Sequence, residues 1–196
     1  MAETRVAGLV LAAGAGSRYG MPKARVHFQG ELLVQRAVRV LTGGGCCPVL
    51  AVLGADSEVV REEAPDLNAV DNPDWQQGMG SSLRVGLKTL GEADAVIILP
   101  VDTPGISAEA ITRLQKLASP DALLRASYHG EPGHPVLIGR QHWEGVYELA
   151  TGDAGAREYL RRHKPDLIPC EDVAEGSDVD TPDQLPMTLD AHPRVV

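Results

Sequence analysis

The residues best suited to chemistry follow the first apolar run of the chain, residues 6–12. The next segment reads Ala12-Ala13-Gly14-Ala15-Gly16-Ser17-Arg18-Tyr19-Gly20-Met21-Pro22-Lys23. Glycines after a strand let backbone N–H groups approach an anion closely, and Arg and Lys add hydrogen bonds and charge. We interpret this loop as a site for the phosphates of a nucleoside triphosphate; the alternative is a flexible turn with solvated cations. The cations between residues 4 and 30, where no Asp or Glu occurs, are Arg5, Arg18, Lys23 and Arg25.

Two common phosphate-binding motifs do not account for this loop. A dinucleotide-binding loop has glycine at its first, third and sixth positions. Here Gly14 and Gly16 occupy the first and third positions, but the sixth is Tyr19. The acidic residue that such a site needs is also absent where the second apolar run ends, at Leu53 and Gly54. A P-loop requires Gly-Lys followed by Ser or Thr, which this segment lacks.

A carboxylate directly follows the apolar run at residues 94–101. The sequence there is Leu99-Pro100-Val101-Asp102-Thr103-Pro104. A side chain just after a buried parallel strand lies at the same sheet edge as the glycine loop. Carboxylate oxygens suit Mg²⁺, which also binds nucleotide phosphates. Asp102 is therefore a candidate metal ligand, although Asp before Thr-Pro is also a common turn former.

A second acidic stretch spans residues 171–183 and contains no Lys or Arg. Most of its carboxylates are expected on a solvated face. The segment Asp178-Val179-Asp180-Thr181-Pro182 differs, because an apolar residue stands between two acids. This pattern predicts a short structured segment that presents one carboxylate inward.

Apolar runs alternate with segments of helical spacing along the first hundred residues. Continuous apolar runs indicate strands covered on both faces, and their alternation with helices predicts a doubly wound parallel α/β unit. The second half is less regular, with Asp153 placed to cap a helix. We find no internal repeat or dividing linker, which predicts a single domain over residues 1–185 and a loose tail over 186–196. The expected strands are 6–12, 48–53, 67–70, 94–101, 122–128, 136–138 and 167–170. The expected helices are 32–41, 57–64, 81–90, 108–118, 141–149 and 154–163.

The composition excludes several classes of protein. The 196 residues are 43% hydrophobic, 23% charged and 4% aromatic, as expected for a globular domain with an aliphatic core. A net charge of −9 argues against a nucleic-acid binder. No apolar run is long enough for a membrane helix, and we recognise no signal peptide. Three cysteines, two of them adjacent, make no disulfide framework, so we expect a cytoplasmic protein.

Six motifs in order resemble the MobA-like nucleotidyltransferase family, and the resemblance spans about residues 6–185. Leu11-Ala12-Ala13-Gly14, with Ala13 where the guanylyl branch has Gly, resembles the molybdenum cofactor cytidylyltransferase (MocA-like) branch. Arg25-Val26-His27 departs from the apolar residues that usually follow the lysine. The other matching segments are Gly78-Met79-Gly80-Ser81-Ser82-Leu83, Leu99 to Pro104, Gly133-His134-Pro135-Val136-Leu137, Gly152-Asp153-x-Gly155-x-Arg157 and Asp178 to Asp183.

The resemblance implies a Rossmann-like three-layer α/β/α fold, mostly parallel, with an antiparallel strand in the second half. It implies transfer of a nucleoside monophosphate, CMP from CTP in this branch, to a molybdopterin-type phosphate with release of pyrophosphate. A molybdenum hydroxylase is then a candidate partner. The alternatives are another base or acceptor, guanylyl transfer included, or a non-catalytic maturation protein that holds nucleotide or molybdopterin.

The same resemblance assigns roles to individual residues. Lys23 and Arg18 would bind the triphosphate, and Asp102 with Asp180 would hold Mg²⁺, Asp178 being the less favoured ligand. Trp75 and Trp143 are expected to be packing residues. His134 would face the acceptor or be structural, and Ser81 and Ser82 would bind base or ribose or form an N-cap pair. The complete set of predicted binding residues is Ala12, Ala13, Gly14, Gly16, Gly80, Ser81, Ser82 and His134.

Overall fold

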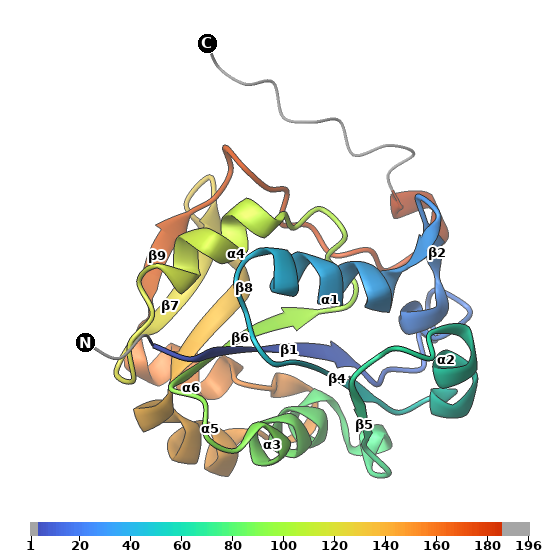
Figure 1. Cartoon of the computed structure of the whole chain (residues 1–196), viewed down its shortest axis with the longest axis horizontal. Helices are drawn as coiled ribbons and strands as arrows, with labels where there is room; N and C mark the ends of the chain where they lie inside the picture. Colours follow the sequence, from blue (N-terminus) through green and yellow to red (C-terminus); the bar gives the residue numbers. More distant parts are fainter. Residues whose placement is uncertain (1–3, 186–196) are drawn as a thin grey trace.

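The computed structural model describes residues 4–185, and within them one mostly parallel sheet lies between two helical layers (Figure 1). Seven strands of this part form the sheet, in the order β5-β4-β1-β6-β8-β7-β9. The strands are β1 Val6–Ala12, β4 Val49–Leu53, β5 Ala69–Asp71, β6 Ala95–Pro100, β7 Leu123–Tyr128, β8 Glu131–Gly139 and β9 Asp166–Pro169. The helices are α1 Leu33–Gly43, α2 Ser57–Glu63, α3 Met79–Leu90, α4 Ala108–Gln115, α5 Trp143–Leu149 and α6 Arg157–His163.

The strand directions confirm the expected fold class. β1 pairs in parallel with β4 and β6, β4 with β5, and β7 with β9. β8 runs antiparallel to both of its neighbours, β6 and β7. The single reversed strand therefore comes from the second half of the chain, as the family resemblance implies.

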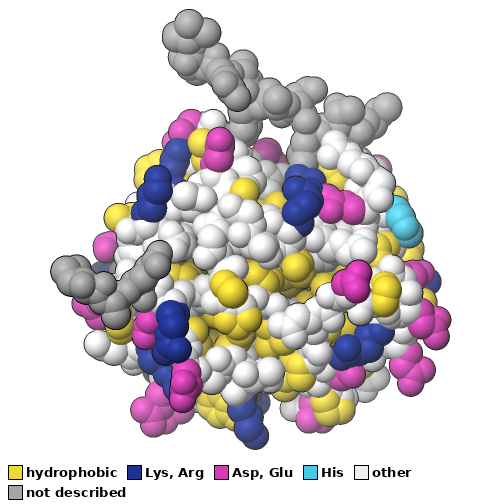
Figure 2. Space-filling model, in the orientation of Figure 1, with side chains coloured by type: hydrophobic (Ala, Val, Ile, Leu, Met, Phe, Trp, Pro, Cys, Tyr) yellow, Lys and Arg dark blue, Asp and Glu magenta, His cyan; other side chains and the backbone are white. Residues whose placement is uncertain are grey.

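Every residue of β1 is buried because helices cover both faces of the sheet. Val6 and Val10 face a core shared with α1 and α4, whereas Leu9 and Leu11 face one shared with α3, α5 and α6. Figure 2 shows hydrophobic side chains across the middle of one face, with charged side chains scattered around them. No helix within residues 4–185 combines the length and the apolar composition needed to span a bilayer.

The register of the central strands places the predicted site at one edge of the sheet. Leu11 of β1 lies beside Pro100 of β6, so both strands end together. The glycine loop leaves the end of β1, and Asp102 follows the end of β6. Parallel neighbours therefore bring the loop and the carboxylate to the same crevice, as the sequence predicts.

Several boundaries differ from the sequence expectation. A short hairpin of β2 (His27–Phe28) and β3 (Glu31–Leu32) was not expected, because two-residue strands leave no periodic pattern. β8 extends over nine residues through the Gly- and Pro-containing segment that was expected to be a turn. α6 begins at Arg157 without a side-chain cap, so the predicted capping role of Asp153 is wrong. The predicted tail, 186–196, lies outside the described residues.

Candidate nucleotide and metal site

Two adjoining cavities, of about 370 and 350 Å³, lie at the sheet edge where β1 and β6 end. Their shared lining comes from Leu11, the glycine loop, Met79 and Asp153. Ionic side chains line the first cavity, and these are Arg18, Lys23, Asp102, Asp153 and Asp180. The second cavity is additionally lined by Ala13, Ala15, Trp75, Gln76, Gly78 and Ser82.

The glycine loop turns tightly around its own backbone. Gly16 has a φ of +61°, and a Cβ there would collide with the carbonyl oxygen of Met21. The N–H of Gly20 donates to the carbonyl oxygen of Gly16 at 2.8 Å. Gly14 lines both cavities, and a Cβ there would meet no neighbouring atom. Gly16 is therefore required by the turn, whereas Gly14 leaves space for a ligand.

Lys23 forms the centre of the ionic cavity. It begins a 3₁₀ turn over Lys23–Arg25, and its Nζ lies 2.9 Å from Asp102 Oδ2 and 2.8 Å from Asp180 Oδ1. Its side chain is only 14% exposed. Burial alone would lower the pKa of Lys23, but hydrogen bonds from Nζ to Asp180 and Asp102 outweigh burial and raise it. The Lys23 ammonium also lowers the pKa of Asp180, so the pair is ionised at neutral pH.

Arg18 contacts the same cluster from the solvent side. Its Nη1 lies 2.7 Å from Asp180 Oδ2, while its side chain is 75% exposed. Lys23 and Arg18, the two cations that the family resemblance assigns to the triphosphate, therefore line one cavity.

Three aspartates gather around Lys23. One carboxylate oxygen each of Asp102, Asp178 and Asp180 lies within 4.8 Å of the others, which agrees with the proximity predicted for Asp102 and Asp180. The buried Val179 holds this segment in place, because its N–H donates to the carbonyl oxygen of Asp102 at 2.8 Å. Asp180 lines the ionic cavity, whereas Asp178 is exposed and does not line it, although its carboxylate is close to the other two. Hard oxygen ligands at this spacing fit a divalent cation such as Mg²⁺.

Arg5 and Arg25 do not reach the cavity, although the sequence placed them with the other loop cations. Arg5 pairs with Asp94 beside the start of β6. Arg25 pairs with Asp56 at 3.0 Å and with Glu63 at 2.9 Å, which ties the 3₁₀ turn to α2. The carboxylates that pair with both arginines are distant in sequence, so they are not counted in the local excess of positive charge. That excess therefore predicted more phosphate-binding side chains than the structure provides.

Replacing Arg25 by Met is expected to loosen the turn that carries Lys23. The ion pairs are partly exposed, so their loss should lower local stability only modestly. Amide exchange of Arg25 and Val26, whose N–H groups bond to Pro22 and Lys23, should accelerate about fivefold, as hydrogen–deuterium exchange would measure. Glu63→Gln should weaken the same tether. Unchanged exchange in both variants would show that the tether does not hold the turn.

Ser81 and Ser82 lie inside α3 rather than at its start. The helix begins at Met79, so the N-cap interpretation of this pair is wrong. Both hydroxyls accept hydrogen bonds from Asn72 Nδ2, at 2.8 and 3.0 Å. Ser82 lines the second cavity, whereas the hydroxyl of Ser81 donates to the carbonyl oxygen of Gly78. Asn72, which has no motif of its own, was not identified from the sequence.

Gly78 and Gly80 hold the start of α3 against the segment that follows α5. Gly78 has a φ of +100°, and a Cβ there would lie 2.5 Å from the backbone of Gly152. A Cβ on Gly80 would lie 2.6 Å from the backbone of Ala150. This close approach brings Asp153 to the lining of both cavities. Gly80 thus packs against Ala150 next to the nucleotide site, whereas the sequence predicted that it binds the nucleotide.

The two tryptophans have different surroundings. Trp143 is buried and its Nε1 donates to the carbonyl oxygen of Ile138 at 3.0 Å, as expected of a packing residue. Trp75 packs closely over Gly54 and lines the second cavity. The expectation that Trp75 is only a packing residue is therefore incomplete.

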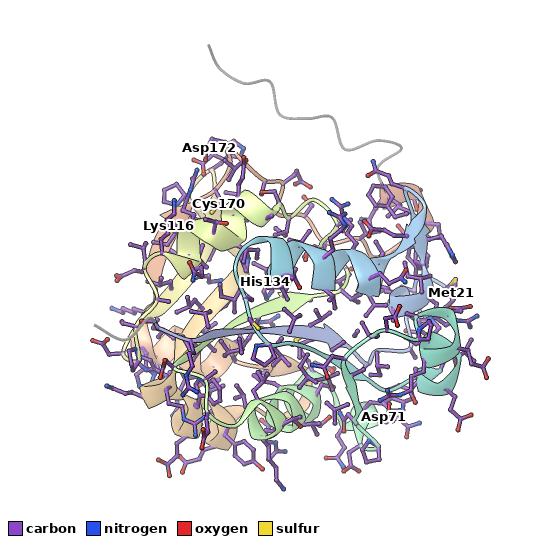
Figure 3. The ribbon with its side chains drawn as sticks, in the orientation of Figure 1. Met21, Asp71, Lys116, His134, Cys170 and Asp172 are labelled. Carbon is purple, nitrogen blue, oxygen red and sulfur yellow. The ribbon has the colours of Figure 1, made fainter. Side chains whose placement is uncertain are left out.

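His134 lies on β8 and is half-buried; in the view of Figure 3 its label is near the middle, whereas Lys116 and Asp172 lie toward one side. The hydroxyl of Tyr128 donates to the carbonyl oxygen of His134 at 2.7 Å. Burial and the nearby charges of Arg125 and Arg157 lower the pKa of the imidazole to about 4, against an opposing effect of Asp178. His134 does not line either cavity.

The depressed pKa of His134 should make folding stability depend on pH. Between pH 6.5 and about 4 the unfolded chain binds this proton and the folded chain does not, so stability falls as pH falls through that range. The loss should approach about 3 kcal/mol. Urea unfolding at pH 7 and pH 4.5 measures it. His134→Gln should flatten the dependence and His27→Gln, at an exposed histidine, should not; equal slopes in all three proteins would contradict the assignment.

Comparison with known proteins places this site in a family context. Residues 8–167 match the MobA-like NTP transferase domain. The chain is 38% identical to nicotine blue oxidoreductase of Paenarthrobacter nicotinovorans over 92% of its own length and 94% of that protein. It is also 38% identical to a probable molybdenum cofactor guanylyltransferase of Opitutus terrae over 53% of its own length and 50% of the relative.

A solved structure, Rv0371c from Mycobacterium tuberculosis, superposes with a TM-score of 0.80. It is 24% identical, and the match covers 93% of this chain and 96% of that one, which extends the fold similarity beyond the matched domain. The family match covers most of the chain and includes the glycine loop, Lys23 and Asp102. The chain therefore belongs to the MobA-like NTP transferase family.

Proposed function

We propose that this protein is a Mg²⁺-dependent cytidylyltransferase that transfers CMP from CTP to the phosphate of a molybdopterin-type acceptor. The observation that carries the proposal is the cluster of Lys23, Arg18, Asp102 and Asp180 in a cavity next to the glycine loop. A relative named as a probable molybdenum cofactor guanylyltransferase supports the acceptor class. A molybdenum hydroxylase would then receive the product.

The proposed reaction needs no covalent enzyme intermediate. An oxygen of the acceptor phosphate attacks the α-phosphorus of CTP, a new P–O bond forms, and the bond to the β-phosphate breaks to release pyrophosphate. Because both substrates are polyanions, positioning and charge neutralisation dominate catalysis. Lys23 and Arg18 bind the triphosphate, and the N–H groups around Gly14 and Gly16 complete the cradle.

Asp102 and Asp180 would hold the divalent cation, with Asp178 close enough to act as a further ligand. A cation bound there would supply positive charge that stabilises the negatively charged phosphates during transfer. The side chains present a hard, anionic oxygen set at the end of β6, which suits this role. Trp75, Gln76 and Ser82 surround the second cavity, which we assign to the base and ribose.

The nucleotide preference provides a test of the cytidylyl assignment. Ala13 lines the second cavity, and its methyl group takes space that Gly would leave open. CTP should therefore bind more tightly than GTP at matched Mg²⁺, by about tenfold or more. Calorimetric titration with CTP, GTP, ATP and UTP measures the order. Tighter binding of GTP would assign the protein to another branch of nucleotidyltransferases.

A second candidate function comes from the relative that matches almost the whole chain. That protein is named nicotine blue oxidoreductase, so an oxidoreductase acting on nicotine blue is the competing assignment. The glycine loop lacks the sixth-position glycine of a dinucleotide site, which favours nucleotidyl transfer. Assays of pyrophosphate release and of nicotinamide cofactor oxidation with nicotine blue distinguish the two. Release of pyrophosphate without cofactor oxidation supports the transferase, and the reverse supports the oxidoreductase.

The third candidate is a non-catalytic carrier of nucleotide or molybdopterin. The pairing of Lys23 with Asp102 and Asp180 goes beyond what binding alone requires, so it favours catalysis. Tight nucleotide binding with no pyrophosphate release from any triphosphate and acceptor would favour the carrier.

A further inference from the structure

The ammonium of Lys23 lies against the same oxygens that would hold the metal. It contacts Asp102 at 2.9 Å and Asp180 at 2.8 Å, so two of its three donors are used by these carboxylates. A Mg²⁺ ion binds oxygens at about 2.1 Å. An ion sharing either oxygen would therefore lie within about 5 Å of Nζ, where a divalent and a monovalent cation repel strongly in a partly buried site.

The charge balance of the cluster points the same way. Three negative charges come from Asp102, Asp178 and Asp180. Two positive charges, from Lys23 and Arg18, offset part of them. Within this cluster only one net negative charge remains to attract a divalent cation, and Asp153, which lines the same cavity, adds one more. Lys23 has the greater effect, because it is mostly buried and bridges two carboxylates, whereas Arg18 contacts only Asp180 and is largely exposed.

A bound polyphosphate would change this balance. Lys23 lines the same cavity as Gly14, Gly16 and Arg18, so its flexible side chain can exchange carboxylate partners for phosphate oxygens. That exchange frees Asp102 and Asp180 and adds negative charge beside them. Metal and nucleotide would then bind with positive coupling, each raising the affinity for the other.

We propose that Lys23 is the resident counter-cation of the metal site, and that a divalent cation binds tightly only after a nucleotide has drawn Lys23 away from Asp102 and Asp180. The proposal rests on the metal site of the proposed function, and it adds an order of binding in which nucleotide precedes the metal. In the nucleotide-free protein Lys23 balances most of the negative charge of Asp102 and Asp180, so tight metal binding becomes conditional on the substrate.

Binding of Mn²⁺ to the nucleotide-free protein tests this directly, with the free ion measured by electron paramagnetic resonance. Lys23→Met should tighten the dissociation constant of Mn²⁺ by at least about tenfold, equivalent to 1.4 kcal/mol. Arg18→Met should tighten it less, and Lys88→Met, at an exposed lysine of α3, should not change it. Equal or weaker Mn²⁺ binding by Lys23→Met would overturn the proposal.

Two further measurements keep the result specific. Asp102→Asn added to Lys23→Met should remove the gained affinity; if the gain survives, the ion binds elsewhere and the proposal is wrong. If Lys23→Met and Lys23→Gln both fail to fold, the wild-type affinity for Mn²⁺ is compared with and without saturating CTP, after correction for Mn²⁺ held by free CTP. At least a tenfold increase supports the proposal, and no increase overturns it.

These outcomes are separable from the proposed function. If Lys23→Met gains no Mn²⁺ affinity while the wild type still converts CTP, the proposed competition between Lys23 and the metal is wrong and the transferase assignment stands. If the gain occurs but no triphosphate is turned over, Lys23 does occupy the cation site and the transferase assignment fails.

Discussion

Asp102→Asn should lower the rate of nucleotidyl transfer by at least about a thousandfold, because it removes charge from the metal ligand at the end of β6. The amide has nearly the same shape, so the loss should appear in turnover rather than in folding. Pyrophosphate release at saturating CTP and acceptor measures it. Asp183→Asn, in the same acidic stretch as Asp180 but at an exposed position, is the control and should keep normal turnover. Activity of Asp102→Asn within tenfold of the wild type would remove Asp102 from the metal site.

The structure also changes the stability expected for this variant. If the carboxylates only repelled one another, removing the charge of Asp102 would leave the metal-free variant at least as stable as the metal-free wild type. Lys23 instead donates to Asp102 at 2.9 Å and neutralises that repulsion. Asp102→Asn should therefore lower the free energy of unfolding by about 1 kcal/mol, as a charged hydrogen bond is weakened in a partly exposed site.

Lys23→Ala should lower turnover by about a hundredfold to a thousandfold, since the lysine supplies charge where the α-phosphate and pyrophosphate develop it. The sequence places Lys23 in a loop, where a side chain usually contributes little to stability, but this side chain is mostly buried between two carboxylates. Its loss should also destabilise the metal-free protein, by about 1–3 kcal/mol, because Asp102 and Asp180 are left facing each other. Steady-state kinetics and thermal unfolding measure the two effects, with Lys88→Ala as the control. Near-normal turnover would show that Lys23 has no catalytic role.

The central fold could be predicted because its strands are buried on both faces. Continuous apolar runs mark β1, β4 and β6, and the intervening segments have helical spacing. The β2–β3 hairpin could not be predicted, because each strand has only two residues. The length of β8 was also missed, since its first half is a polar segment whose pairing with β7 depends on tertiary contacts.

The ionic part of the site was predictable because its residues follow the ends of parallel strands. Lys23 and Asp102 come to one crevice by topology, and Val179 anchors Asp180 beside them. The residues around the second cavity were harder to identify. Asp153 reaches it only because Gly78 lets the backbone of Gly152 approach, a contact between segments more than seventy residues apart.

The most direct test of the central claim is the product formed from CTP. The purified protein is incubated with CTP, Mg²⁺ and molybdenum-bearing molybdopterin, and the products are identified by mass spectrometry. We predict molybdopterin cytosine dinucleotide and an equal amount of pyrophosphate, with both products formed at least about a thousandfold more slowly by Asp102→Asn. Absence of nucleotidyl transfer from CTP in the wild-type protein, or equal product from Asp102→Asn, would contradict the account.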